Sequence, residues 1–376
     1  MKVLFTSHWY PSVEKPNQGI FIQKHYESIQ QSDVDVTLLV IRIKHGKKIL
    51  KRRIIEQPNN QIELVVESVL WKFLYLFYPL QRLFIWKYAL NKIKKEKYDL
   101  VHANITHPNG VFGHYLSKRL GVPFIITEHH SQVEKYAHKA VTKNGFNSAL
   151  KAAKYITSVS SFLKQKIKRI NPSLETKIKV IGNVVDKAIF KKISNQKIEP
   201  NQFISVANWN SGSANTKLPF LICEALHHFS LRDRKQIVLN HVGNCNRKDE
   251  LLAYETAYFK INFLGKKKPK EINHLLNSNA CFLHATKFET FCVVGVEAQK
   301  AGCPVIISNI NPINKILNHE SVIFADNELD SWIEALNIFK TKSFSRQEIA
   351  DFNNSKFGVK EIGMAFRKLY NVTQKK

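Results

Sequence analysis

Two glutamates eight positions apart are the most specific arrangement of chemical groups in this chain. Glu289 lies at the mouth of an expected helix, and Glu297 lies about two turns inside it among apolar neighbours. We expect Thr290 to cap this helix, whose first free N–H groups could hold a phosphate. An ionised carboxylate accepts two hydroxyl hydrogen bonds at once. The pair therefore predicts a site for an elongated ligand, with a sugar at the mouth and a ribose deeper. Two solvated helix glutamates would not explain the apolar surroundings of Glu297.

Histidines are a second source of chemistry. The chain has 15 of them, and most are expected to be surface or structural residues. His129 and His130 end an expected strand, 124–127, and open α/β sheets bind ligands beyond the carboxyl ends of their strands. His129 could donate to a sugar hydroxyl or to a departing phosphate. We rank His129 ahead of His130, and place His107 third.

Short runs of β-branched and aromatic residues alternate with longer mixed segments, which is typical of a parallel sheet with crossover helices. In the first half the expected strands are 2–6, 34–41, 62–67, 100–103, 124–127, 155–159 and 179–181, with helices at 21–31, 110–120 and 161–170. The pattern then restarts, with strands at 203–207, 236–242, 261–264, 280–284 and 304–308, and helices at 219–229, 248–256, 269–276 and 291–301. The repeated pattern predicts two doubly wound α/β domains, joined by a polar, lysine-rich linker around 186–201.

The composition fits two ordinary globular domains. The chain has 376 residues, too many for one compact core, and 44% of them are hydrophobic. Its 57 basic and 30 acidic residues give a formal charge of +27, which predicts a nucleic acid, a membrane surface or a phosphorylated ligand as partner. A generally lysine-rich, solvated surface is the alternative. Up to Phe190 there are 31 basic and 13 acidic residues, a difference of +18 that makes the first half the favoured docking surface.

Several other classes of protein are disfavoured. Five cysteines without a CxxC pair predict reduced thiols and no zinc site. The first residues read as a strand rather than a signal peptide, and no apolar run is long enough for a spanning helix. No G-x-G-x-x-G, P-loop or G-x-S-x-G motif occurs, which argues against dinucleotide oxidoreductases, P-loop ATPases and serine hydrolases. Asp33 and Asp35 match a metal-binding Asp-x-Asp, but they open a strand and are interpreted as solvated.

One segment interrupts the α/β pattern. Residues 69–90 are rich in aromatic residues and include Lys72, Arg82 and Lys87, and a basic run, 91–97, follows. Such a segment suits a helix pair in a bilayer interface, where each basic residue contributes about 1 kcal/mol near an anionic leaflet. An ordinary helix hairpin packed on the first domain explains the same residues. A helix pair that lies in the interface and also packs on the domain would satisfy both interpretations.

The order Glu289, Glu297-Ala298, Gly302 and Pro304-Val305 resembles the signature of the family 4 retaining glycosyltransferases of the GT-B fold. The resemblance covers nearly the whole chain. It also includes Trp9-Tyr10-Pro11 with Gly19-Ile20-Phe21-Ile22, Val101-His102-Ala103 with His107-Pro108-Asn109-Gly110, Thr127-Glu128-His129, Ile181–Asp186 and the closing Phe366–Tyr370.

The resemblance implies two Rossmann-like domains facing a cleft. The acceptor-side domain would be 1–186, completed by a closing helix at about 361–376, and the nucleotide-sugar domain would be 187–360. The residue matching Glu289 contacts the transferred sugar, the one matching Glu297 binds ribose, and the histidine matching His129 lies near the reacting centre. Gly19 lets backbone approach donor phosphate and acceptor.

The sequence departs from the family pattern at the diphosphate. The family's Gly-Arg-Leu after the first strand of the second domain is Ala207-Asn208-Trp209 here, so its arginine is missing. Lys217 is the candidate for the partner lysine, because departing diphosphate needs positive charge. Arg247 and Lys266 are candidate substitutes for the arginine. The turn expected after the strand that holds Pro304-Val305 is Ile310-Asn311-Pro312 instead of Gly-Gly.

These observations lead to one leading hypothesis. It is a retaining glycosyltransferase that uses a UDP- or GDP-sugar, requires no metal or cofactor, and acts on a membrane-linked glycan or lipid in polysaccharide synthesis. The predicted catalytic residues are His129, Glu289 and Lys217, with Gly19, Asn208, Thr290, Phe291 and Glu297 on the donor and His107 and His130 on the acceptor. A peripheral cytoplasmic protein at an anionic membrane is expected. The alternatives are a catalytically weakened binding protein of the same fold and, on charge alone, a nucleic-acid binder.

Overall fold

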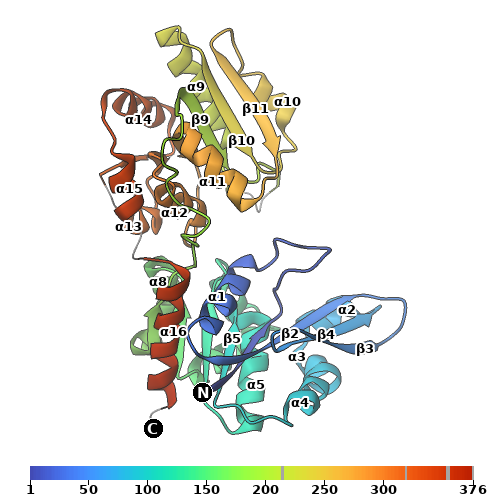
Figure 1. The fold of residues 1–376 in the computed structure, drawn as a ribbon. Helices are drawn as coiled ribbons and strands as arrows, with labels where there is room; N and C mark the ends of the chain where they lie inside the picture. The colour runs from blue at the N-terminus through green and yellow to red at the C-terminus, as the bar shows by residue number, and fades with distance from the viewer. Residues whose placement is uncertain (213–215, 318–319, 353–355, 375–376) are drawn as a thin grey trace. The chain divides into compact units, whose positions relative to one another are not determined.

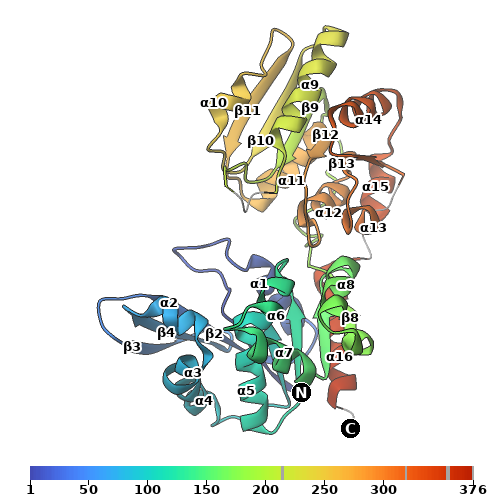
Figure 2. The ribbon, with the colours of Figure 1, turned by 180° about the vertical axis from the view of Figure 1, so that it is seen from behind.

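The protein consists of two α/β units, shown from opposite sides in Figures 1 and 2. The structure is a computed structural model that describes residues 1–212, 216–317, 320–352 and 356–374. The first unit comprises Met1–Val184 together with Val359–Lys376, and the second comprises Val185–Gly358. The C-terminal segment therefore completes the unit that the N-terminus begins. The class predicted from the sequence, α/β with two Rossmann-like domains, is confirmed.

The first unit is built on an eight-stranded sheet in the order β3-β4-β2-β1-β5-β6-β7-β8. All neighbours are parallel except β3 and β4, which form an antiparallel edge pair. The strands are β1 (Lys2–Ser7), β2 (Asp35–His45), β3 (Lys51–Gln57), β4 (Gln61–Ser68), β5 (Leu100–Asn104), β6 (Phe124–Glu128), β7 (Tyr155–Ser158) and β8 (Ile178–Val180). Strands β5 and β6 are buried at every residue, as parallel strands covered on both faces are. Strand β3, which the sequence analysis missed, is almost wholly exposed.

Two helices of the first unit show clear boundary signals in the sequence. Ser160 accepts a hydrogen bond from the Leu163 N–H and starts α8, and Gly121 (φ 70°) ends α5. The α-helices are α1 (Ile20–Gln30), α2 (Trp71–Leu76), α3 (Tyr78–Gln81), α4 (Lys87–Ile93), α5 (Val111–Leu120), α6 (Val133–His138), α7 (Lys143–Ala152), α8 (Ser161–Ile170) and α16 (Val359–Gln374); shorter helical turns are η1 (Arg82–Trp86), η2 (Thr106–Gly110) and η3 (Pro172–Lys177). The predicted closing helix, about 361–376, corresponds to α16, which the structure describes as far as Gln374. It packs on α1, where a Cβ at Gly363 would lie 2.1 Å from the Ser28 carbonyl oxygen.

The second unit has a six-stranded parallel sheet in the order β11-β10-β9-β12-β13-β14. Its strands are β9 (Glu199–Val206), β10 (Ile237–Val242), β11 (Phe259–Gly265), β12 (Asn279–His284), β13 (Val305–Ser308) and β14 (Val322–Ala325). Its helices are α9 (Pro219–Asp233), α10 (Lys248–Leu252), α11 (Pro269–Ser278), α12 (Val293–Lys300), α13 (Ile313–Ile316), α14 (Leu329–Thr341) and α15 (Arg346–Phe352). Strand order reverses between β9 and β12, so this is the switch point at which doubly wound sheets bind ligands.

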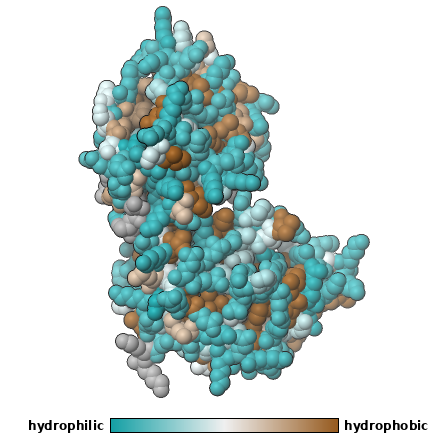
Figure 3. Space-filling model, viewed as in Figure 1, coloured by the Kyte–Doolittle hydropathy of each residue, from teal (hydrophilic) through white to brown (hydrophobic). Residues whose placement is uncertain are grey.

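The aromatic–basic segment, 69–97, is helical as expected, but it forms four short pieces (α2, α3, η1 and α4) rather than two helices. Ile85, Trp86, Ala89 and Ile93 are buried, whereas Phe73 and Phe77 are 67% and 47% exposed. The segment therefore packs on its unit and also presents apolar side chains outward. Figure 3 shows a largely hydrophilic face with separate hydrophobic patches. Among the described residues, no helix is both long and apolar enough to cross a bilayer.

Candidate functional site

A cluster of polar side chains lies at the carboxyl edge of the second sheet. His284 is the last residue of β12. Two residues further on, Thr286 forms an isolated antiparallel β-bridge with Lys217. The Lys217 ammonium donates to a carboxylate oxygen of Glu289 and lies 3.4 Å from the Thr286 hydroxyl. The His284 Nε2 lies 3.2 Å from the same Glu289 oxygen. The structure thus brings together two of the predicted catalytic residues, Lys217 and Glu289, on the sheet's switch point.

The charges of this cluster are well defined. Burial opposes the ionisation of Glu289, but the charge of Lys217 and the hydrogen bonds from His284 and Lys217 outweigh it and lower its pKa to about 2. Burial, and then the charge of Lys217, lower the pKa of His284. At neutral pH Glu289 is therefore a carboxylate in contact with Lys217, beside an uncharged imidazole. A carboxylate in this state can accept hydrogen bonds from sugar hydroxyls.

The helix that follows begins later than the sequence predicted. Helix α12 starts at Val293, with Cys292 at its N-cap in the left-handed region (φ 69°), so Thr290 is not the cap. The expectation failed because the chain turns left-handed at Cys292 before it becomes helical. Glu297 is consequently about one turn inside α12 rather than two, and it is 8% exposed. The predicted donor residue Phe291 is buried with its ring against Phe357, at 5.0 Å between centroids.

The loops after β9 and β10 are fastened to each other. The Asn208 side chain, a predicted donor residue, accepts a hydrogen bond from the backbone N–H of Asn244. A Cβ at Gly243 would lie 1.9 Å from the Ala207 carbonyl oxygen, so these loops touch through their backbones. Arg247, a candidate for the missing cation, is bound to Glu250 and stacks 4.2 Å from the Phe220 ring. Lys266 is exposed just beyond the end of β11.

Three potential metal ligands occur in this cluster. One ligand atom each from His284, Glu289 and Cys292 lies within 4.8 Å of the other two. Burial raises the pKa of the Cys292 thiol well above its ordinary value, and only the thiolate is a good metal ligand. The ammonium of Lys217 already contacts Glu289.

The first unit has a histidine-rich site at the carboxyl edge of its own sheet. His129 follows β6 and is 6% exposed, with its ring 5.1 Å from that of His25 and 4.7 Å from that of Phe21. Neither ring nitrogen of His129 has a hydrogen-bond partner of standard geometry among the described residues. Burial, and then the neighbouring His25 and His102, lower its pKa well below the ordinary value. The imidazole is neutral at pH 7 and can donate from one nitrogen and accept at the other.

The two predicted acceptor residues lie in the same region. His107 is buried, bonded to the Tyr78 hydroxyl, and stacked on Tyr136 with 4.4 Å between ring centroids. His130 is half-buried and makes edge contacts with Tyr136 and Trp9. Burial lowers the pKa of His107 to about 3 and also lowers that of His130. These side chains form an aromatic and uncharged cluster.

Sequence reasoning missed two residues of these sites. His284 lies beside Glu289, and His8, which directly follows β1, is 8% exposed and hydrogen-bonded to Asn109. Both positions stand at carboxyl ends of predicted parallel strands, the same signal that selected His129. Applying that rule to every strand end would have found them.

Gly19 occupies a position that only glycine suits. It has a φ of 70°, and a Cβ there would lie 2.5 Å from the Trp9 carbonyl oxygen. We expect Gly19→Ala to lower the free energy of unfolding by about 1–3 kcal/mol and to displace the loop after β1. Urea denaturation measures this, with Gly121→Ala as matched control, because Gly121 also has a φ of 70° but nothing within 4 Å of an added Cβ. Equal losses in the two variants would show that the close contact with Trp9 has no effect.

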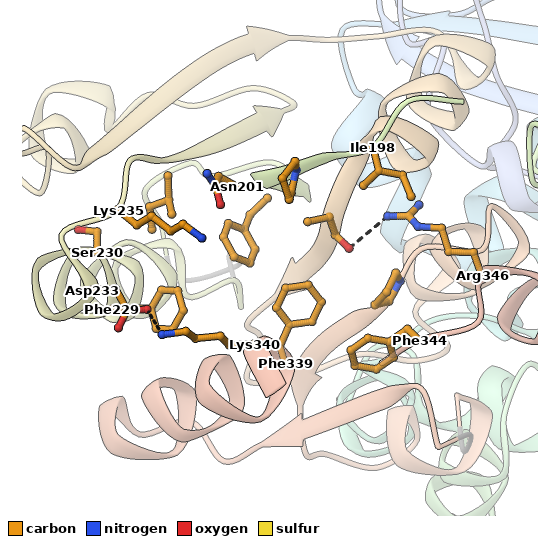
Figure 4. A pocket seen from close by; sticks show the side chains of 15 residues that line it. Ile198, Asn201, Phe229, Ser230, Asp233, Lys235, Phe339, Lys340, Phe344 and Arg346 are labelled. Atoms are coloured by element: carbon orange, nitrogen blue, oxygen red, sulfur yellow. Dashed lines mark hydrogen bonds and ion pairs between the residues drawn. The ribbon is translucent and has the colours of Figure 1, made fainter. Parts of the chain in front are cut away.

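The second unit also has an apolar cavity of about 360 Å³. Figure 4 shows the rings of Phe229, Phe339 and Phe344 around it and the ion pair between Asp233 and Lys340 at one side. It is lined by residues that begin β9 and β10, and by Ala280 and Pro304 near the starts of β12 and β13. The candidate residues stand at the opposite ends of these strands. The cavity is thus separate from the Lys217–Glu289 cluster.

Comparison with known proteins gives a consistent result along the chain. A model of Glycosyltransferase Family 4 matches residues 25–188, and one of Glycosyl transferases group 1 matches residues 186–355. The proposed teichuronic acid biosynthesis glycosyltransferase TuaC of Bacillus subtilis is 21% identical over 373 residues, covering 93% of this chain and 92% of that protein. The glycosyltransferase MJ1178 of Methanocaldococcus jannaschii is 22% identical over 325 residues, covering 84% of this chain and 81% of its own.

Solved structures agree in fold at low sequence identity. Anabaena Alr3699/HepE in complex with UDP and glucose has a TM-score of 0.70 at 15% identity, with 99% of each chain covered. The lipopolysaccharide outer core galactosyltransferase WaaB has a TM-score of 0.69 at 17% identity, again with 99% of each chain covered.

Proposed function

The chain belongs to the glycosyltransferases of family 4 and group 1, and on that premise we propose that it transfers a sugar from a UDP- or GDP-sugar to a membrane-linked glycan or lipid with retention of configuration. The Lys217–Glu289 pair is the observation that carries this proposal. It combines an ionised carboxylate with a fixed cation at the switch point of the second sheet, where a sugar diphosphate needs both.

The proposed roles are those that the family resemblance implies for these residues. Glu289 accepts hydroxyl hydrogen bonds from the transferred sugar, and Glu297 binds the ribose. Lys217 and the first N–H groups of α12 meet the charge that develops on the departing diphosphate, so we propose that no metal is required. The sugar's bond to the diphosphate oxygen breaks as its bond to the acceptor oxygen forms on the same face, and the acceptor proton passes to the diphosphate. His129 lies near the reacting centre, and His107 and His130 contact the acceptor.

Relatives support the choice of substrates. Alr3699/HepE has been solved with UDP-glucose, which favours a nucleotide-sugar donor of the same kind here. TuaC and WaaB are named for teichuronic acid and lipopolysaccharide synthesis, which favours a cell-surface polysaccharide as the product.

Release of nucleoside diphosphate from a panel of UDP- and GDP-sugars tests the proposal. The protein is incubated with each donor and a membrane extract that supplies acceptors, and released UDP or GDP is measured. We expect turnover with one donor and thermal stabilisation by its diphosphate. If no donor is turned over but one still stabilises the fold, the alternative of a catalytically weakened binding protein is correct. That alternative is favoured by Asn208, which stands where the family has arginine and holds the Asn244 backbone instead.

We further propose that the protein acts in the cytoplasm, peripherally at the inner face of an anionic membrane. The docking face consists of the exposed apolar side chains of Val69, Leu70, Phe73, Phe77, Leu83 and Phe84 and the basic residues around them. Phe73, Phe77 and Leu83 are 67%, 47% and 52% exposed. Among the cations, Arg52 on β3 donates to the Phe84 carbonyl and lies 4.7 Å from the Tyr88 ring, so it borders the same helices.

Sedimentation with liposomes tests this docking face. We expect Phe73→Ser with Phe77→Ser to weaken binding to vesicles that contain anionic lipid by roughly tenfold or more, because each buried ring contributes about 1.5–3 kcal/mol. Replacing Lys94, Lys95 and Lys97 with serine should reduce binding only where the vesicles are anionic. Leu231→Ser with Leu252→Ser is the matched control, since both leucines are exposed on the second unit. Binding that survives both sets of changes, or equal binding to neutral vesicles, would contradict the proposal.

A further inference from the structure

The proposed transfer does not use the apolar cavity of the second unit. The cavity's volume of about 360 Å³ is in the range of small-molecule sites. Its lining comes mainly from the amino-terminal ends of β9 and β10 and from the carboxyl-terminal ends of α9 and α14. Because Lys217 and Glu289 follow the carboxyl ends of strands of the same sheet, a ligand in this cavity would be separate from the sugar donor.

Phenylalanine rings make up much of the lining, as Figure 4 shows. The Phe339 ring lies edge-on to that of Phe203, at 5.8 Å between centroids, and stacks on that of Phe344 at 5.5 Å. Since these rings pack on one another, they present a fixed apolar surface before any ligand binds. Moving an alkyl chain from water onto such a surface is favourable in proportion to the apolar area that is buried.

Most polar side chains around the cavity are already bonded to other groups of the protein. Lys340 is paired with Asp233 at 2.7 Å, and the Ser230 hydroxyl donates to a backbone carbonyl of α9. Arg346 donates to four backbone carbonyls in the segment 276–280. A ligand gains little by bringing polar groups to these positions, because their bonds within the protein would have to be broken. The body of the ligand is therefore best a hydrocarbon.

Lys235 and Asn201 differ from these residues. Lys235 lies just before β10, is exposed, and has no hydrogen bond or ion pair among the described residues. Figure 4 shows its side chain reaching from the edge of the cavity toward the rings. Asn201, on β9, also lines the cavity, and its side-chain amide has no hydrogen-bond partner in the described part of the chain. One ammonium and one amide complement a head group with a single negative charge, which is that of a carboxylate.

We propose that this cavity binds a medium-chain fatty acid, with the hydrocarbon chain among the phenylalanine rings and the carboxylate on Lys235 and Asn201. At roughly 30 Å³ for each water-sized group, the volume holds about twelve such groups, the size of decanoate. The inference goes beyond the proposed function and does not depend on sugar transfer.

Isothermal titration of the full chain with fatty acids, each below its micelle concentration, tests the site. Hexanoate, octanoate and decanoate vary the chain, and decyltrimethylammonium carries the opposite charge on a chain of the same length as decanoate. We expect affinity to increase about fourfold with each methylene added from hexanoate to decanoate. Decyltrimethylammonium should bind more weakly than decanoate. An affinity that does not change with chain length, or equal binding of the two decyl compounds, would contradict the proposal.

Exchange of Lys235 tests the head group. Lys235→Met should weaken decanoate binding by about two- to fivefold, the usual range for an exposed ion pair, and should leave the binding of decan-1-ol unchanged. Lys270→Met is the matched control, because it removes an exposed lysine from α11 of the same unit, outside the cavity. Lys235 is exposed, so this variant keeps the fold.

A second pair of variants tests the place of the chain. Ala280→Leu adds a larger side chain to the lining, so it should weaken decanoate and decan-1-ol by tenfold or more. Ala253→Leu, at an exposed position of the same unit, should weaken neither. Urea denaturation of each variant checks that it folds. Decanoate binding that Lys235→Met and Ala280→Leu both leave unchanged would overturn the inference. Because no donor is present, a failure of sugar transfer would not affect this result.

Discussion

Glu289→Ala is expected to lower kcat for sugar transfer by about 10²–10³-fold, the usual effect of removing one preorganised group from a polar catalytic site. The carboxylate is ionised at neutral pH, because its pKa is about 2, and it is held in place by Lys217 and His284. It is therefore ready to accept sugar hydroxyls without rearrangement. Steady-state kinetics with the active donor from the panel, at saturating acceptor, measure the change.

The control for Glu289→Ala is Glu334→Ala, which removes an exposed carboxylate from α14 of the same unit. Glu334→Ala should leave kcat unchanged. Glu289→Gln is a further variant, because it keeps the shape of the side chain and loses its charge. If the negative charge holds Lys217 and His284 in place, Glu289→Gln should be little more active than Glu289→Ala. A Glu289→Ala enzyme with kcat within threefold of the parent would contradict the proposed role.

Lys217→Met should have the second large effect, on both activity and pH dependence. Loss of the cation opposite the departing diphosphate should lower kcat by about 10²-fold or more. It also removes the charge that keeps Glu289 ionised, so burial then raises the pKa of that carboxyl. The variant should therefore lose activity and stability on acidification at a higher pH than the parent does.

The sign of the pH effect follows from linkage. In the parent the folded-state pKa of Glu289 is depressed from 4.5 to about 2, so its stabilisation is complete above pH 4.5 and is lost as the pH falls toward 2. A shift of this size corresponds to roughly 3 kcal/mol. Urea denaturation between pH 2 and 7 measures it, with Lys287→Met, an exposed lysine two residues before Glu289, as control. Identical pH profiles for parent and Lys217→Met would refute the coupling.

Much of the framework could be predicted because parallel strands and their helices leave strong local signals. The run 124–127 is apolar and β-branched, and it forms β6, buried at every residue. Helix α8 was predicted with its observed ends, since Ser160 caps it and the polar Asn171 follows it. Strand β3 was missed because it lies at a sheet edge, so its charged residues face solvent and show no apolar alternation.

The details of the site depend on tertiary structure, which local patterns do not record. Thr290 is a good N-cap residue by type, but the left-handed turn at Cys292 moved the helix start beyond it. That turn is stabilised by packing, since Cys292 is buried and Gly295 in the next turn lies close to Leu317. Likewise, 72 positions separate Lys217 from Glu289, and only the pairing of the Lys217 segment with Thr286 brings them together. The residue types indicated the chemistry of this site, but the contacts between its residues depend on how the strands pair.

The apolar cavity of the second unit affects how ligand screens on this protein should be read. Four phenylalanines (Phe203, Phe229, Phe339 and Phe344) are among the residues that line it, and its volume is in the range of drug-sized ligand sites. A hydrophobic compound that binds there raises the melting temperature by mass action, as any ligand of the folded state does. Yet a strand of six residues spans about 20 Å, so such a compound sits far from the Lys217–Glu289 cluster. Displacement of a nucleotide, rather than thermal stabilisation alone, would identify inhibitors of transfer.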